Sequence, residues 1–163
     1  QTSIVCAHLL DNGQVDFIIT NYPNSGLSNT QNVRMINEFH DVFVADRSHF
    51  PLEGKKLSLQ DLQQYPILML DRKSTTSEFL HRMFQRSQLD LVPEIELSSN
   101  DLLIDLARIG LGIAFVPDFC IPKNEEQLYV LDLEESLPAR QMVVAYNENL
   151  PISQAARQFM DML

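Results

Sequence analysis

The residues best suited to chemistry are four successive hydroxyl side chains, Ser74, Thr75, Thr76 and Ser77, which follow an apolar run and open an amphipathic one. The first turn of a helix has unpaired backbone amides and about half a unit of positive dipole charge, which favour a bound anion. Four hydroxyls exceed what one helix N-cap needs. The sequence therefore predicts a site for a carboxylate or similar anion, with plain capping as the alternative.

A second pair of hydroxyls, Ser98 and Ser99, stands where another strand is expected to lead into a helix. It has the same two interpretations, binding or capping, but fewer spare groups. Arg72 and Lys73 flank the first site. They could add positive charge there or be solvated loop residues.

Other kinds of chemistry are not supported. The four histidines, at positions 8, 40, 49 and 81, show neither HExxH nor HxH spacing. No serine lies in a G-x-S-x-G turn. Gly110-Leu111-Gly112 lacks the third glycine of a dinucleotide fingerprint and indicates a helix end instead, and Cys120 has no basic neighbour to activate its thiol. We therefore expect no enzyme activity, no metal and no cofactor.

The elements that position these residues follow from the apolar pattern. Short runs apolar on both faces predict strands covered on both sides, as in parallel α/β sheets. They are Phe17–Ile19, Val42–Ala45, Ile67–Leu70, Ile113–Val116 and Met142–Ala145, with further strands expected at Glu94–Leu97 and Leu128–Leu133. The spacing of apolar residues in 152–163 predicts a C-terminal helix with Pro151 in its first turn.

Three internal helices begin with an S/T-x-x-D/E motif, in which the first side chain accepts an amide proton and the fourth reaches back. The motifs start at Ser58, Thr75 and Ser98. The last two follow directly on predicted strands, and open α/β sheets bind ligands at such junctions.

Composition narrows the class of protein. The chain has 163 residues, 45% of them hydrophobic, which suffices for one sizeable core or two small lobes. No run approaches the roughly 18–20 apolar residues of a membrane span, and the first residues lack a secretion signal. The net charge of −10, without a basic cluster, would repel a phosphate backbone. Two distant cysteines favour a reducing compartment, so we expect a cytoplasmic protein. From the charge we expect that this chain does not itself bind nucleic acid.

Four segments, in chain order, match motifs of one known family. Residues 9–19 read LLDNGQVDFII, like "LLxxGxxDxxI", and residues 46–52 are similar to "xxxHPL". Residues 57–62 match "LSLxDL", and 98–117 match a serine-led helix followed by "GLGIxxxP". Together these segments cover nearly the whole chain and resemble the effector-binding domain of LysR-type transcriptional regulators.

The resemblance implies an α/β fold of two Rossmann-like lobes, of the type II periplasmic-binding-protein kind, with a small effector in the cleft. Lobe I would comprise residues 1–39 and 141–163, and lobe II residues 40–140. The crossings would lie near His40–Asp46 and Met142–Asn147.

The resemblance also implies which residues bind the effector. The family's contacts come from the loop matching Lys73 to Ser77, a threonine matching Thr2, and a strand end matching Thr20 and Asn21. Ser98 and Ser99 adjoin that pocket. Hydroxyls and amides accept many carboxylates, sugars or oxyanions, so the pattern indicates a small polar or anionic metabolite without fixing its identity.

By comparison with the family, lobe I is expected to be incomplete, because a strand, a helix and another strand normally precede the position of Thr2. The winged helix-turn-helix that reads DNA in such regulators is also expected to lie outside this chain. The full-length protein would be a homodimer or homotetramer that contacts DNA only through that domain, without membrane contact.

Two other functions remain open at this stage. A periplasmic-type solute-binding protein of the same fold would bind a ligand without a regulatory output. An enzyme on a related two-lobed fold would need a convergent acid, base or nucleophile, which the sequence does not offer.

Overall fold

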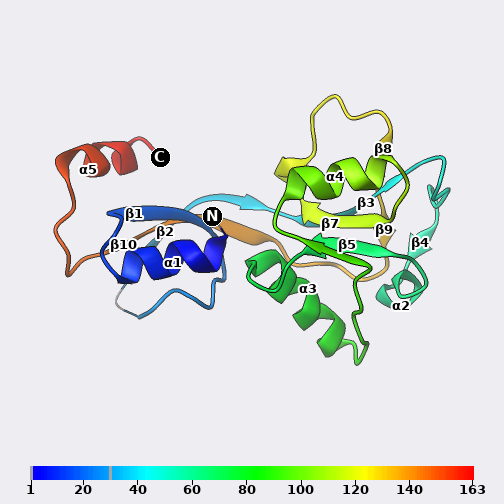
Figure 1. Ribbon diagram of the computed structural model, residues 1–163, viewed down its shortest axis with the longest axis horizontal. Coiled ribbons are helices and arrows are strands. Elements are labelled where there is room, and N and C mark those ends of the chain that lie inside the picture. The colour runs from blue at the N-terminus through cyan, green and yellow to red at the C-terminus, as the bar shows by residue number, and fades with distance from the viewer. Residues whose placement is uncertain (1, 30) are drawn as a thin grey trace. The chain divides into compact units, whose positions relative to one another are not determined.

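The computed structural model describes residues 2–29 and 31–163, which form two compact units (Figure 1). Unit 1 comprises Gln1–Phe39 and Ala139–Leu163, and unit 2 comprises His40–Pro138. The chain therefore leaves unit 1 after Phe39 and returns to it at Ala139.

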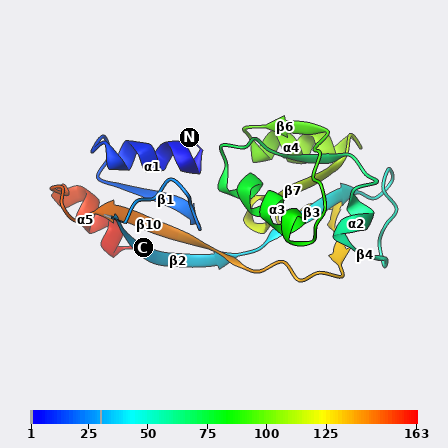
Figure 2. The same cartoon turned by 90° about the horizontal axis from the view of Figure 1, so that it is seen from below.

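Unit 1 is built on a three-stranded antiparallel sheet in the order β1 (Phe17–Tyr22), β10 (Arg140–Asn147) and β2 (Gln31–Phe39). Ile18 of β1 packs with Ala7 of helix α1 (Ser3–Asp11), whereas its neighbour Phe17 stacks on Phe159 of helix α5 (Gln154–Asp161). Successive strand residues point to opposite faces. Helices α1 and α5 thus cover opposite faces of this sheet (Figures 1 and 2).

Unit 2 contains a five-stranded mixed sheet in the order β6-β5-β7-β3-β8. Strand β5 is parallel to β6 and β7, whereas β3 is antiparallel to β7 and β8. The bounds are β3 Asp41–Asp46, β5 Ile67–Leu70, β6 Ile95–Leu97, β7 Ile113–Pro117 and β8 Leu128–Val130. A short parallel pair, β4 (Lys56–Leu57) with β9 (Asp132–Leu133), completes the strands of the described residues.

Most of the expected strands are present, but Leu128–Leu133 forms two strands, β8 and β9, in different sheets, and β2 was not expected. The expectation of parallel pairing is only partly right. Unit 1 is antiparallel throughout, and unit 2 is mixed. A strand that is apolar on both faces is covered by helices on both sides. This covering is possible whether the neighbouring strands run parallel or antiparallel to it.

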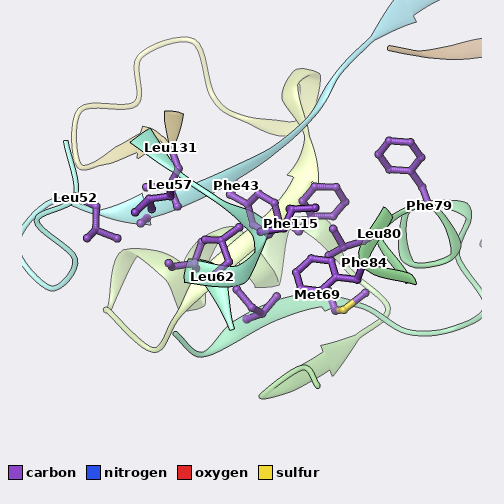
Figure 3. Packing of buried hydrophobic residues seen from close by; sticks show 14 of the residues in the cluster. Phe43, Leu52, Leu57, Leu62, Met69, Phe79, Leu80, Phe84, Phe115 and Leu131 are labelled. Carbon is purple, nitrogen blue, oxygen red and sulfur yellow. The ribbon is translucent and has the colours of Figure 1, made fainter. Parts of the chain in front are cut away.

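Two apolar clusters lie on opposite faces of the unit 2 sheet. In β7, Ile113 and Phe115 face helices α2 (Leu59–Leu62) and α3 (Thr75–Arg86), while Ala114 and Val116 face helix α4 (Asn100–Arg108). Figure 3 shows the first cluster, with Phe115 among the labelled side chains. The sheet is therefore the middle layer of three, with α3 and α4 on its two sides (Figure 1).

The helix starts confirm one N-cap motif and correct two. Ser58 caps α2 with the complete reciprocal pair, because its side chain accepts from Asp61 N and Asp61 accepts from Ser58 N. The predicted caps Thr75 and Ser98 are each wrong by one residue, since Ser74 caps α3 and Ser99 caps α4. In both cases a second hydroxyl residue beside the predicted cap takes the extended backbone conformation that a cap needs.

The ends of α4 and α5 give one confirmation and one correction. Gly110, at φ 77°, follows α4, and a Cβ there would lie 2.2 Å from Cγ of His49, so the glycine does end a helix. Pro151 is not in the first turn of α5. Ser153 caps that helix instead, because its Oγ accepts from Ala156 N at 3.2 Å and donates to Asp16 Oδ2 at 2.5 Å.

The turn after β3 is organised by one buried carboxylate. Asp46 accepts hydrogen bonds from Ser48 Oγ at 2.5 Å, His49 Nδ1 at 2.5 Å and His49 N at 3.0 Å. The hydrogen bond from Ser48, followed by that from His49, lowers the pKa of Asp46 below its ordinary value. The ionised form is therefore bound more tightly by the folded chain than by the unfolded one.

Asp46 is expected to make unit 2 sensitive to acid. A carboxylate with a depressed folded pKa stabilises the fold fully above its unfolded pKa, which is about 3.9, and loses that contribution as the pH falls below it. In urea unfolding at pH 7 and pH 3, the stability lost on acidification should be smaller for Asp46→Asn than for the wild type. Asp90→Asn, at an exposed site, should leave the loss unchanged, and an equal loss in all three proteins would contradict this role.

Candidate effector site

The first turn of α3 follows β5 through the short loop Asp71-Arg72-Lys73. Ser74 ends this loop, and its Oγ accepts a hydrogen bond from Ser77 N at 3.0 Å. Its carbonyl accepts from Glu78 N at 3.1 Å. Because Ser74 alone meets the capping requirement, the hydroxyls of the next three residues are not needed as caps.

Two of those hydroxyls are buried without a protein partner. Oγ1 of Thr75 and Oγ of Ser77 make no hydrogen bond to any described residue, although the two residues are only 2% and 0% exposed. Thr76 is buried as well. Almost all buried polar side chains in native proteins have a partner, so two unpaired hydroxyls in one helical turn call for an explanation.

Charged and ionisable groups flank this turn. Arg72 and Lys73 are exposed, and the backbone N–H of Lys73 donates to Asp71 Oδ1 at 3.0 Å. His81 lies one turn beyond Ser77, and its Nε2 is also buried without a hydrogen bond to the described residues. Burial, and secondarily the charge of Arg72, lowers the pKa of His81, which keeps the ring neutral at pH 7.

The start of α4 belongs to the same edge of the unit 2 sheet. Strands β5 and β6 are parallel neighbours with Leu70 opposite Leu97, so their carboxyl ends lie side by side. Ser99 accepts from Leu102 N at 3.3 Å and is occupied as a cap, whereas Ser98 is exposed. The structure therefore places the segment 73–77 and the pair 98–99 at two adjacent strand ends, as the sequence motifs require.

Three further predicted residues lie in unit 1. Thr2 precedes α1 in an extended conformation, but its Oγ1 makes no capping bond and is buried without a described partner. Thr20 is buried in β1, where its Oγ1 accepts from Asn24 Nδ2 at 3.0 Å, and Asn21 is half-buried beside it. The same Asn24 nitrogen donates to the carbonyl of Ser3 at 3.0 Å. Asn24 thus ties the end of β1 to the first turn of α1.

Sequence reasoning did not mark Asn24, and it set His81 aside because the histidines show no metal-binding spacing. Asn24 stands in a Pro-Asn-Ser-Gly stretch that predicts only a turn, so no signal marked it. His81 could have been found, because a residue four positions after Ser77 on a helix lies on the same face.

The thiol of Cys120 is not a nucleophile in this structure. Burial, followed by the charge of Asp101, raises its pKa to about 11, so the thiolate does not form at neutral pH. Within 2–29 and 31–163, no group of three or more His, Cys, Asp and Glu side chains is arranged to hold a metal ion. At the edge of unit 2 the described residues offer hydrogen-bond donors and a helix N-terminus.

Comparison with protein families assigns the chain. The family model described as the LysR substrate binding domain matches residues 2–163. The chain belongs to this family. As a LysR substrate-binding domain it has the effector-binding role that the motifs suggested, and the solute-binding alternative is not favoured.

The curated relatives of this LysR domain are transcriptional regulators. It is 28% identical over 134 residues to the transcriptional activator CmpR of Synechocystis, covering 81% of this chain and 44% of that protein. It is 26% identical to the RuBisCO operon transcriptional regulator of Allochromatium vinosum, covering 93% of this chain and 50% of the relative. The chain thus spans about half the length of the curated relatives it matches. These relatives are regulators and not enzymes.

Solved LysR regulatory domains share the fold. The CcmR regulatory domain of Synechocystis PCC6803, in complex with 2-PG, superposes with a TM-score of 0.87 at 23% identity, covering 99% of this chain and 78% of that one. The effector-binding domain of QuiR, in complex with shikimate, gives 0.84 at 20% identity, covering 99% and 76%. The two-lobed, periplasmic-binding-protein-like architecture implied by the motifs is therefore confirmed. No helix in the described part of this LysR domain is long and apolar enough to cross a membrane.

Proposed function

We propose that this LysR domain binds a small anionic metabolite through the first turn of α3. The observation that carries the proposal is the pair of buried, unpaired hydroxyls of Thr75 and Ser77. A buried polar group without a partner costs about 1–3 kcal/mol. A ligand that accepts hydrogen bonds from both hydroxyls would remove this cost when it binds.

The chemistry of the turn favours an anion over a cation or a neutral molecule. Both hydroxyls can donate, and the positive end of the α3 dipole adds to their effect. Hydrogen bonds to an ionised acceptor are roughly twice as strong as those between neutral groups. The solved relatives that hold 2-phosphoglycolate and shikimate, two small polar acids, support this class of ligand.

We propose further contacts at the other residues that the family resemblance indicated. In unit 2 these are Lys73, Ser74, Thr76, Ser98 and Ser99, of which Ser74 and Ser99 already serve as caps. In unit 1 they are Thr2, Thr20 and Asn21. Thr2 is supported by its own buried, unpaired Oγ1, whereas Thr20 already accepts a hydrogen bond from Asn24.

We propose that effector binding regulates DNA binding in the whole protein. A ligand shifts a conformational equilibrium only by its difference in affinity for the two states, and a tenfold shift needs about 1.4 kcal/mol. One charge-assisted hydrogen bond to Thr75 or Ser77 supplies that much. The whole protein would be a cytoplasmic homodimer or homotetramer that contacts DNA through another part of its chain. The net charge of −10 of this chain supports this, because it would repel a phosphate backbone.

A thermal-shift screen of small acids tests the proposed function. The panel contains 2-phosphoglycolate, shikimate and other hydroxylated or phosphorylated carboxylates, each with its neutral methyl ester or amide as the matched control. A true effector at a hundredfold excess over its Kd should stabilise the domain by about 2.7 kcal/mol, while its neutral analogue should not. If the acids and their neutral analogues stabilise the domain equally, the proposed preference for an anion is wrong.

A further inference from the structure

Unit 1 contains a cavity of about 630 Å³ at the C-terminal part of α5. This volume lies within the range of about 300–1,000 Å³ that is typical of small-molecule sites. Part of the lining is apolar, including Leu150 and Ile152 from the segment before α5. The rest includes four charged side chains, which lie at solvent-exposed positions of the wall.

The four charges comprise two bases and two acids from three parts of unit 1. Arg34 comes from β2, Glu148 from the segment after β10, and Arg157 with Asp161 from α5. Arg157 and Asp161 are four residues apart on the helix and therefore lie on the same face. A cavity with both signs of charge on its wall suits a ligand with both signs of charge.

These four groups do not neutralise one another. None of them forms an ion pair with another residue of the described chain. Arg34 donates from Nη2 to the carbonyl of Met160 in the last turn of α5, which leaves its other N–H groups available. The guanidinium of Arg34 is thereby fixed at the cavity wall.

We propose that this cavity binds a zwitterion with an apolar side chain, such as an α-amino acid of the size of leucine or phenylalanine. Its carboxylate pairs with Arg34 and Arg157, because a guanidinium fork matches a carboxylate bidentately. Its ammonium group pairs with Glu148 and Asp161 near the negative end of the α5 dipole. The side chain packs on Leu150 and Ile152.

Ligands with a single charge fit this wall less well. A simple carboxylate would meet the two arginines but would also lie against two acids, and a simple amine would meet the reverse situation. Only a ligand that carries both charges satisfies all four groups. The site shares no residue with the first turn of α3, so it is independent of the effector site proposed above.

Calorimetric titration of this chain with L-leucine and L-phenylalanine tests the proposal. We expect saturable binding at one site for at least one of the two. The matching acid without an ammonium group (4-methylpentanoate or 3-phenylpropanoate) and the matching amine without a carboxylate (isoamylamine or phenethylamine) should bind at least tenfold more weakly. Absence of binding by both amino acids up to 10 mM, or equal binding of the singly charged analogues, would overturn the proposal.

Substitutions locate the binding. Arg157→Gln and Glu148→Gln are at exposed positions and should each weaken amino-acid binding about tenfold without loss of the fold. Arg86→Gln and Glu94→Gln, exposed charges of unit 2, are the matched controls and should have no effect. Removal of the Thr75 and Ser77 hydroxyls should leave amino-acid binding intact. If that removal abolishes binding, or if the two cavity variants bind as well as the wild type, the zwitterion does not occupy this cavity.

Discussion

The double variant Thr75→Val, Ser77→Ala is expected to bind the effector at least 100-fold more weakly and to be more stable than the wild type without ligand. Each lost hydrogen bond to an anion is worth about 1.5–3 kcal/mol, and tenfold in affinity corresponds to about 1.4 kcal/mol. Valine has the shape of threonine with a methyl group in place of the hydroxyl, so the substitution leaves no cavity in unit 2. Because two buried, unpaired hydroxyls disappear, the free energy of unfolding should rise by roughly 2–6 kcal/mol.

The opposite signs of these two effects separate a binding role from a structural one. Calorimetry with an effector from the anion screen gives the affinity, and urea unfolding without ligand gives the stability. Ser74→Ala is the matched control, because it removes a hydroxyl that caps α3 and should cost about 1 kcal/mol of stability. If the double variant is destabilised as much as Ser74→Ala and binds with unchanged affinity, the hydroxyls serve the fold and not the effector.

Phe115→Ala is expected to destabilise unit 2 by about 3–5 kcal/mol. Phe115 is fully buried at the centre of the sheet, and its ring lies 4.6 Å from that of Phe43 and 6.4 Å from that of Phe79, measured between centroids. Alanine would leave a cavity between β7, β3 and α3. Since the average domain has only about 5–15 kcal/mol of stability, this is a large part of the total.

Urea unfolding followed by circular dichroism measures this effect. Phe119→Ala provides the comparison, because Phe119 is 52% exposed and a surface substitution changes stability by about 0.5 kcal/mol or less. If both alanine variants lost the same small amount of stability, Phe115 would not be a core residue of unit 2.

Most of the strands were predictable because their residues are apolar on both faces, whereas β2, whose residues are largely exposed, was not. The runs at Ile67–Leu70 and Ile113–Val116 are apolar on both faces, and the structure covers both faces with helices. Pairing direction was not predictable from these runs. Whether β3 runs parallel or antiparallel to β7 depends on the path of the chain between them and not on which side chains are apolar.

The helix starts show why the N-cap motif gives the wrong residue where hydroxyl residues are neighbours. The sequence offers four hydroxyl residues in succession at α3 and two at α4, and the S/T-x-x-D/E rule selected Thr75 and Ser98. The backbone instead turns at Ser74 and Ser99, whose side chains accept from the amide three residues on. This single-residue difference matters for function, because it leaves the hydroxyl of Thr75 outside the cap and unpaired.

The candidate site was therefore predictable in location but not in detail. The hydroxyl run and the strand-to-helix junction marked the first turn of α3, whereas the local pattern does not tell which hydroxyls already have hydrogen-bond partners. The link that Asn24 makes between Thr20 and the carbonyl of Ser3 joins residues of two different elements, and a local pattern does not encode such a contact. The cavity beside α5 likewise gathers its charges from β2, the segment after β10 and the helix.

The most direct test of the central claim is a crystal structure of this domain with the effector identified by the anion screen. We predict an anionic oxygen within about 3 Å of both Thr75 Oγ1 and Ser77 Oγ, at the start of α3. An effector bound elsewhere, with these two hydroxyls still buried and unpaired, would contradict the account.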